Sequence, residues 1–226
     1  MNPDASIIII TKNQRDYLEQ SLPIIFSQTF SNFEVIVVDS GSKDGSLELV
    51  KEYPVKLIEI KPERFNYAYA FNQGASLAKG DYLVRLSGDA VPKDKSWLGN
   101  LLKDFEDDKV AGIYSRWINF PEANLIDKFI VRVSMPNKKM IFIKAPNWNG
   151  ASGALRRNLW QKYPFNENLS FCEDLDWSRK VEKDGYLIVY EPTSLVYHSH
   201  KENIFSFYKR GFKTIWALIK IYIKKI

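Results

Sequence analysis

Three carboxylates in the segment "CEDLDW" could carry acid–base chemistry. Glu173, Asp174 and Asp176 begin a pattern that predicts a helix ending near Gly185. Negative side chains are stabilised at a helix N-terminus by the helix dipole, so these acids could serve only to favour the helix. A carboxylate can also act as a general base that accepts a proton from a hydroxyl group. The residues alone favour the first interpretation.

A single acid, Asp89, stands where the apolar run "DYLVRL" breaks into the turn "SGDAVP". The acid could belong to the turn, or it could bind a cation, because Mg²⁺ and Mn²⁺ need few carboxylates when phosphate oxygens supply further ligands. His198 and His200 follow an apolar run in "SLVYHSH", and an imidazole is a common metal ligand. A lone histidine is more often a surface or hydrogen-bonded residue, which is the alternative interpretation.

The elements that position these residues are predicted to alternate between strands and helices. The expected strands are apolar on both faces, and the expected helices have helical periodicity. The strands are "SIIIIT", "FEVIVVDS", "VKLIEI" and "DYLVRL", and the helices are "DYLEQSLPIIFSQ", "DGSLELVKEY" and "YAYAFNQGASLAK". This order predicts an α/β fold, with a mostly parallel central sheet flanked by helices. Ligands bind such sheets at the edge formed by the C-terminal ends of the strands.

Polar residues follow three of the predicted strands and would meet at that edge. They lie at 11–13, in "DSGSKDGS" from Asp39, and at 87–89. For Asp39, a helix N-cap or an Asx turn before the helix at Ser46 is an equal alternative. Three such strand ends together indicate a ligand site. Neither G-x-G-x-x-G after the first strand nor G-x-x-x-x-G-K-[ST] is present, which argues against a dinucleotide fold and a P-loop.

Composition indicates one large domain with a distinct C-terminal segment. The chain has 226 residues, 45% of them hydrophobic, and a net charge of +5. Residues 201–226 hold seven Lys or Arg and one Glu, so the remainder is close to neutral and nucleic acid is not an expected partner. The single cysteine, Cys172, and the absence of a signal-peptide pattern predict a cytoplasmic protein.

The C-terminal segment 201–226 is predicted to be a basic amphipathic helix outside a domain formed by residues 1–200. Lys213 and Lys220 interrupt it too much for a transmembrane helix. Its aromatic and basic residues favour an interfacial helix on the inner face of the cell membrane. Packing against the domain or against a partner subunit is the alternative.

Five segments resemble the family 2 glycosyltransferases with the GT-A fold. They are "SIIIITKN", "FEVIVVDSGSKDGS", "FNQGASLAKGDYLVRLSGDAVP", "NGASGALRR" and "CEDLDWSRKVEKDG", and the resemblance covers about residues 5–200. It implies a nucleotide-sugar donor, a divalent cation (Mg²⁺ or Mn²⁺) and inversion at the anomeric carbon. Thr11, Asn13 and Ser42 then correspond to the nucleotide pocket, Asp39 to a contact with the base, and Gly150 to the floor beneath the donor sugar.

The resemblance also implies a metal site and a base. Some GT-A enzymes bind the metal through a histidine after the last sheet strand, so His198, or alternatively His200, would be a second metal ligand, with His198 as the first choice. Asp89 matches the last acid of the family's D-x-D motif, which contacts the metal, while Ser87 replaces the first acid, which contacts the ribose. This departure, with "YHSH", is similar to the rhamnosyltransferase-like branch and implies a deoxythymidine-diphosphate-linked rhamnose donor. Asp174 matches the catalytic base, and Glu173 would orient the acceptor or share that role.

Four other side chains have both a functional and a structural interpretation. Trp177 could stack on a sugar or belong to the core. Arg156 and Arg157 could contact phosphate or remain solvated, and Asn72 could close over the donor or lie in the aromatic face of a core helix.

The sequence therefore predicts an inverting, metal-dependent glycosyltransferase. The acceptor would be a saccharide or a lipid-linked saccharide in the synthesis of cell-surface polysaccharide. Two other classes of function remain open. One is a nucleotidyltransferase that acts on a sugar phosphate, and the other is a non-catalytic scaffold that binds nucleotide sugars.

Overall fold

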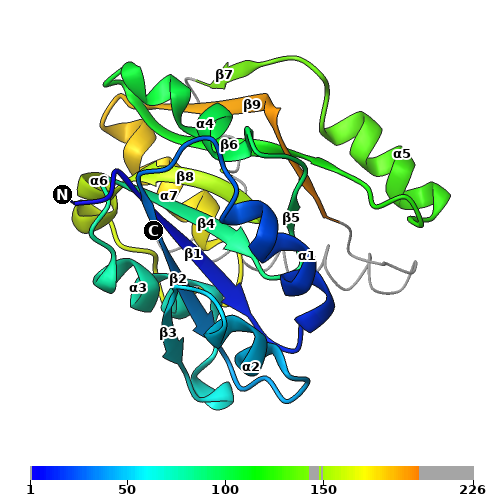
Figure 1. Ribbon diagram of the computed structural model, residues 1–226. Coiled ribbons are helices and arrows are strands. Elements are labelled where there is room, and N and C mark those ends of the chain that lie inside the picture. The colour runs from blue at the N-terminus through cyan, green and yellow to red at the C-terminus, as the bar shows by residue number, and fades with distance from the viewer. Residues whose placement is uncertain (1, 143–147, 149, 199–226) are drawn as a thin grey trace.

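The computed structural model describes residues 2–142, 148 and 150–198 (Figure 1). His200 and the segment 201–226, with its predicted interfacial helix, lie outside the described residues. Within the described part of the chain, no helix combines the length and the apolar character that a membrane span requires.

Nine strands in the described residues form one sheet, in the order β3-β2-β1-β4-β8-β6-β9-β5, with β7 paired to β9. Strands β1 to β4 are parallel to one another, as predicted. The later strands mix the two directions, because β8 runs antiparallel to β4 and β6 while β6 and β9 are parallel. The strands are β1 Ala5–Thr11, β2 Phe33–Asp39, β3 Lys56–Glu59, β4 Tyr82–Ser87, β5 Val91–Pro92, β6 Val110–Ile118, β7 Met140–Phe142, β8 Ser152–Arg156 and β9 Leu187–Tyr197.

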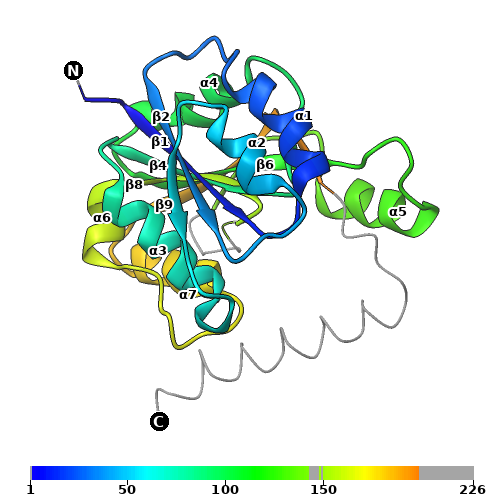
Figure 2. The ribbon, with the colours of Figure 1, turned by 60° about the horizontal axis from the view of Figure 1, so that its bottom comes forward.

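Helices cover both faces of this sheet. Figure 2 shows α1, α2 and α4 on one side and α3, α6 and α7 on the other. The predicted acid helix is α7, and it begins at Glu173 as the sequence indicates. The helices are α1 Arg15–Ile25, α2 Ser46–Lys51, α3 Tyr67–Leu77, α4 Trp97–Leu102, α5 Leu125–Ser134, α6 Arg157–Lys162 and α7 Glu173–Lys183, with short 3₁₀ turns η1 Pro62–Arg64 and η2 Lys103–Glu106.

The continuous apolar run of β1 is explained by this double cover. Alternate residues of a strand point to opposite faces of the sheet. Ile7 and Ile9 accordingly pack in the core cluster under α1 and α4, whereas Ile8 and Ile10 pack in the cluster formed with α3 and α7. A strand buried on both faces has no polar face, so its polar residues come only after its end.

The polar strand ends do meet at one edge. Thr11 lies opposite Asp39 in the register of β1 and β2, and Ile10 lies opposite Ser87 in β1 and β4. The short strand β5, which follows Asp89, pairs with the last residues of β9. This pairing brings the end of β9 to the same edge, although about a hundred residues of chain separate the two.

Candidate functional site

The loops after β1 and β2 are hydrogen-bonded to each other, and we call residues 11–15 and 39–46 the loop edge. The backbone N–H of Asn13 donates to Ser42 Oγ at 2.8 Å, and the N–H of Lys43 donates to Asn13 Oδ1 at 2.7 Å. Asn13 has φ of 52°, in the left-handed region that Asn tolerates better than most residues. The two predicted nucleotide contacts, Asn13 and Ser42, are thus brought together.

Asp39 forms an Asx turn at the centre of the loop edge. The carboxylate accepts hydrogen bonds from the N–H groups of Gly41 (2.8 Å) and Ser42 (2.9 Å) and from the Ser42 hydroxyl. The residue is fully buried. One of the two structural interpretations is therefore confirmed, and a contact of Asp39 with a nucleotide base stays a prediction.

Thr11 and the turn after β4 are in close contact. The Thr11 hydroxyl donates to Gln14 Oε1 at 3.2 Å. Gly88 lies directly against both side chains, because a Cβ at this position would come within 2.1 Å of Gln14 Oε1 and 2.8 Å of Thr11 Oγ1. Glycine at position 88 thus lets the turn that carries Asp89 approach the loop edge.

The two predicted metal ligands face each other. Asp89 Oδ1 lies 3.4 Å from His198 Nδ1, and it also accepts a hydrogen bond from the Ser87 hydroxyl at 2.5 Å. The His198 ring is held edge-on to Trp117, and its backbone N–H donates to Ile118 O at 3.0 Å. Two donor atoms on neighbouring positions of an octahedral Mg²⁺ or Mn²⁺ stand about 3 Å apart, so this pair fits one shared cation.

This pair supplies two protein ligands. Among the residues that the structure describes, no group of three or more His, Cys, Asp or Glu side chains could hold a metal ion. A cation at Asp89 and His198 would therefore take its remaining ligands from water or from a phosphate-bearing ligand, as Mg²⁺ commonly does.

The other end of the site contains a buried ion pair that the sequence reasoning missed. Arg85 of β4 donates from Nη1 to Glu173 Oε1 at 2.8 Å, and the side chains are 8% and 5% exposed. Gly150 packs on the guanidinium, since a Cβ there would lie 2.6 Å from Arg85 Nη1. The signal was an arginine in the apolar run "DYLVRL", because a charge in a buried strand requires a partner.

Glu173 is therefore paired with Arg85, and its negative charge acts on the adjacent residue, Asp174. Asp174 Oδ1 accepts from the N–H of Leu175 at 2.8 Å, and Oδ2 accepts from the N–H of Gly150 at 3.3 Å. Burial raises the pKa of Asp174 to about 7, and the negative charge of Glu173 acts in the same direction, against Arg85 and the two N–H groups. We call Arg85, Glu173, Asp174 and Gly150 the charged cluster.

A carboxylate with a pKa near neutrality is suited to general base catalysis. At pH 7 it is partly ionised and holds a proton more strongly than an ordinary aspartate. The other acid of the segment, Asp176, instead pairs with Lys180 one helical turn later, at 2.7 Å. Of the three carboxylates in "CEDLDW", Asp174 is thus the one whose environment favours proton transfer.

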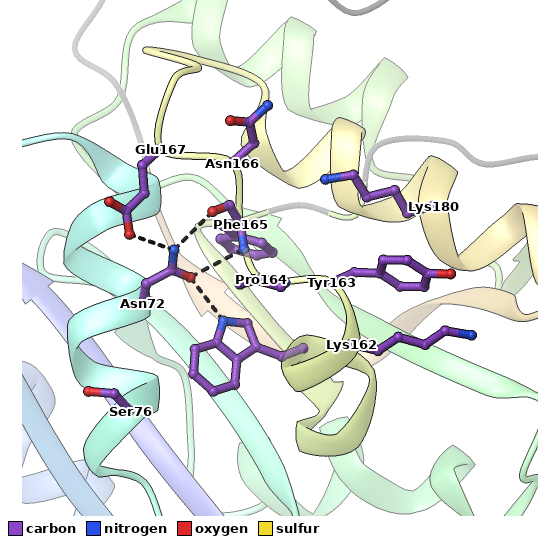
Figure 3. A pocket seen from close by; sticks show the side chains of 10 residues that line it. Asn72, Ser76, Lys162, Tyr163, Pro164, Phe165, Asn166, Glu167 and Lys180 are labelled. Carbon is purple, nitrogen blue, oxygen red and sulfur yellow. Dashed lines mark hydrogen bonds between the residues drawn. The ribbon is translucent and has the colours of Figure 1, made fainter.

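Two side chains with alternative interpretations belong to the core or support it. Trp177 is fully buried, and its ring centroid lies 5.9 Å from that of Trp148. The side-chain amide of Asn72 donates to Glu167 Oε1 at 2.9 Å and accepts from the indole of Trp160 at 2.9 Å (Figure 3). Asn72 therefore ties α3 to the segment before α7, which favours the structural interpretation of this residue.

Arg156 ends β8 and Arg157 begins α6, at the other end of the sheet. Arg156 donates to the backbone carbonyls of Val110 and Phe105, each at 2.8 Å. It stands opposite Tyr82, the first residue of β4, whereas the turn with Asp89 follows the last. Arg156 thus supports the backbone at the end of β4 opposite to the end that leads to Asp89.

Known proteins share the sequence pattern of this chain. The model of Glycosyl transferase family 2 matches residues 6–159. The chain is 27% identical over 222 residues to the O-antigen chain rhamnosyltransferase RfbN of Salmonella typhimurium, a match that covers 92% of this chain and 70% of that protein. It is 27% identical over 199 residues to the O-antigen chain rhamnosyltransferase WbaN of Salmonella anatum, covering 83% and 63%.

Solved structures share the fold. The mannosyltransferase PcManGT from Pyrobaculum calidifontis, in complex with GDP-Man and Mn²⁺, superposes with a TM-score of 0.74 at 21% identity, covering 100% of this chain and 64% of that one. S. aureus TarS 1-349 in complex with UDP-GlcNAc gives 0.67 at 18% identity, covering 90% and 60%. The fold is thus GT-A-like, as predicted. The chain spans less than two thirds of both solved chains and of one of the two curated relatives.

Proposed function

Because the chain belongs to glycosyl transferase family 2, we propose that it transfers a sugar from a nucleoside-diphosphate donor to an acceptor hydroxyl, with inversion at the anomeric carbon. The observation that carries the proposal is Asp174, whose pKa is raised to about 7 beside the Arg85–Glu173 pair. Rhamnose, linked to deoxythymidine diphosphate, is the proposed donor sugar, since both curated relatives named above are O-antigen rhamnosyltransferases. The acceptor is a saccharide or a lipid-linked saccharide of the cell surface.

In the proposed reaction, the acceptor oxygen attacks the anomeric carbon on the face opposite the diphosphate. The new C–O bond forms as the bond to the phosphate oxygen breaks, and the electron pair leaves with the diphosphate. Asp174 accepts the proton of the acceptor hydroxyl through its carboxylate. The Gly150 N–H, bonded to Asp174 Oδ2, and the Leu175 N–H, bonded to Oδ1, orient this carboxylate.

The remaining residues bind the donor. Asp89 and His198 would hold a divalent cation, which supplies positive charge to the leaving diphosphate. Ser87 donates to Asp89 and so orients one of its oxygens. The loop edge, with Asn13 and Ser42, forms a rigid rim on which a nucleoside can rest without reordering of the loops.

A donor screen tests this function. The full chain is incubated with deoxythymidine-diphosphate-rhamnose, GDP-mannose and UDP-GlcNAc, with and without Mn²⁺, and release of the nucleoside diphosphate is measured. Mn²⁺-dependent turnover of the rhamnose donor in excess over the other two is expected. Asp89→Ala should abolish the metal-dependent part, whereas the control Asp81→Ala, at an exposed acid before β4, should not. Absence of binding and turnover with all three donors would contradict the proposal.

A further inference from the structure

Helix α5 carries an apolar stripe that faces away from the domain. Leu125, Phe129 and Val133 are 84%, 68% and 67% exposed. Residues four apart lie on the same side of a helix, so these three form one continuous surface. Figure 2 shows α5 standing at the side of the molecule, away from the layers that cover the sheet. We call Leu125, Phe129 and Val133 the α5 stripe.

The opposite side of α5 packs on the domain. The stripe is therefore not the side of the helix that contacts the core. Val131 and Met135 pack against the core cluster that contains α3 and α7. Asn124 caps the helix by accepting from the N–H of Asp127 at 2.8 Å, and Arg116 Nε donates to Met135 O at 3.1 Å. The helix is thus fixed with one apolar side turned inward and the other presented outward.

The exposed charges on α5 itself are positive. Lys128 and Arg132 are exposed and lie one turn after Leu125 and Phe129, which places them on the border of the stripe. The acid of the helix, Asp127, is 7% exposed, and its carboxylate accepts from the side-chain amide of Asn124 at 3.1 Å. An apolar stripe bordered by cations is complementary to a surface with negative charge over an apolar layer.

Charge also discriminates between the possible occupants. The segment 201–226 contains seven Lys or Arg and one Glu, and a second copy of α5 would bring Lys128 and Arg132 against their own equivalents. Both would place like charges together, which is unfavourable. We propose that the α5 stripe docks on an anionic lipid bilayer, with Lys128 and Arg132 against lipid phosphates and the three apolar side chains in the boundary between headgroups and acyl chains.

The position of α5 gives this docking a consequence for the reaction. The helix begins soon after β6, whose last residue, Ile118, accepts from the backbone N–H of His198. A bilayer under α5 would therefore lie close to the edge that carries Asp89. A saccharide on a membrane lipid would then lie at that edge. This consequence rests on the proposed function, whereas the docking itself does not depend on the proposed function.

Vesicle co-sedimentation of the full chain tests the docking and requires no donor or acceptor. The vesicles contain either phosphatidylglycerol with phosphatidylethanolamine, or phosphatidylcholine alone. The chain is expected to bind the anionic vesicles more strongly. The triple variant Leu125→Ser, Phe129→Ser, Val133→Ser should lower the partition coefficient at least about tenfold, because the apolar contribution is lost. The control is Leu77→Ser, at a leucine on α3 that is 51% exposed, and it should bind as the unchanged chain does.

The segment 201–226 is identical in these variants, so the ratio between triple variant and control isolates α5. Replacement of Lys128 and Arg132 by Gln should lower binding about fivefold for each charge at low salt, and less at high salt. Equal binding of the triple variant and the control overturns the proposal. A lower melting temperature of the triple variant would indicate that the stripe contacts another part of the same chain. A loss of dimer in sedimentation would indicate that it contacts a second copy. Either result, together with unchanged vesicle binding, also overturns the proposal.

Discussion

The loop edge is held by hydrogen bonds that include two carboxylates, the buried Asp39 and the exposed Asp44, whereas the charged cluster contains the buried Arg85–Glu173 ion pair beside the partly buried Asp174. At the loop edge, Asn13 and Ser42 are 29 residues apart, and the bonds join loops after adjacent strands. In the charged cluster, Arg85 and Glu173 are 88 residues apart. The first region is therefore a preformed rim, and the second is an arrangement in which burial of charge shifts the pKa of one acid, Asp174.

The largest expected effect is on catalysis at the charged cluster. Asp174→Asn removes the proposed base and should lower kcat by about 10²–10⁴-fold, with the far-ultraviolet circular dichroism unchanged. The matched control is Asp176→Asn on the same helix, which loses only the pair with Lys180 and should keep most of the activity. Sugar transfer by Asp174→Asn at the rate of this control would remove Asp174 as the base.

The next effect concerns the stability of the buried pair. Arg85→Met leaves Glu173 buried without its cation and should lower the free energy of unfolding by about 3–5 kcal/mol, measured by urea denaturation. The double variant Arg85→Met, Glu173→Gln removes both charges and should recover a large part of that loss. A double variant as unstable as the single one would show that packing, and not the unpaired charge, is responsible.

The raised pKa of Asp174 predicts a pH dependence with a definite sign. Its pKa in the folded protein is about 7, above the value of 3.8 for a free aspartate. The stability from this shift is present below pH 4 and is lost as pH rises to 7 and above. Asp174→Asn should therefore gain stability relative to the unchanged chain between pH 5 and pH 8, by at most about 4 kcal/mol.

The activity should move in the other direction, because the base must be ionised to accept a proton. The kcat/KM for sugar transfer should rise with pH, with a midpoint near 7. A rise of kcat/KM with a midpoint near pH 4 would mean that Asp174 has an ordinary pKa. The charged cluster would then not differ from the loop edge in shifting the pKa of an acid.

The smallest effect is expected at the loop edge. Ser42→Ala removes the hydroxyl that donates to Asp39 and accepts from the Asn13 N–H, and it should lower the free energy of unfolding by about 1–2 kcal/mol. Ser76→Ala on α3, whose hydroxyl bonds within its own helix at an exposed site, is the control and should change stability little. A loss of catalysis with unchanged nucleotide affinity in Ser42→Ala would place Ser42 in the reaction rather than in the rim.

Sequence patterns predicted the elements well because their causes are local. The apolar run of β1 and the start of α7 at Glu173 lie where the alternation and the acids indicate them. Thr11, Asp39 and the turn with Asp89 were expected to lie close together because the C-terminal ends of parallel strands lie at one edge of a sheet. Arg85 was missed because its partner is distant in the chain, and two interpretations stayed open for Asn72 and Arg156 because their partners are distant as well.

By itself, the sequence determined the fold class, the edge that carries the site and the identity of the acids, since periodicity and strand ends depend on neighbouring residues. Tertiary structure decided which acid has the environment that favours proton transfer. It paired Glu173 with Arg85, raised the pKa of Asp174 and brought Asp89 to 3.4 Å from His198. These outcomes depend on burial and on charges brought together from distant segments, and such energies are not defined until the chain has folded.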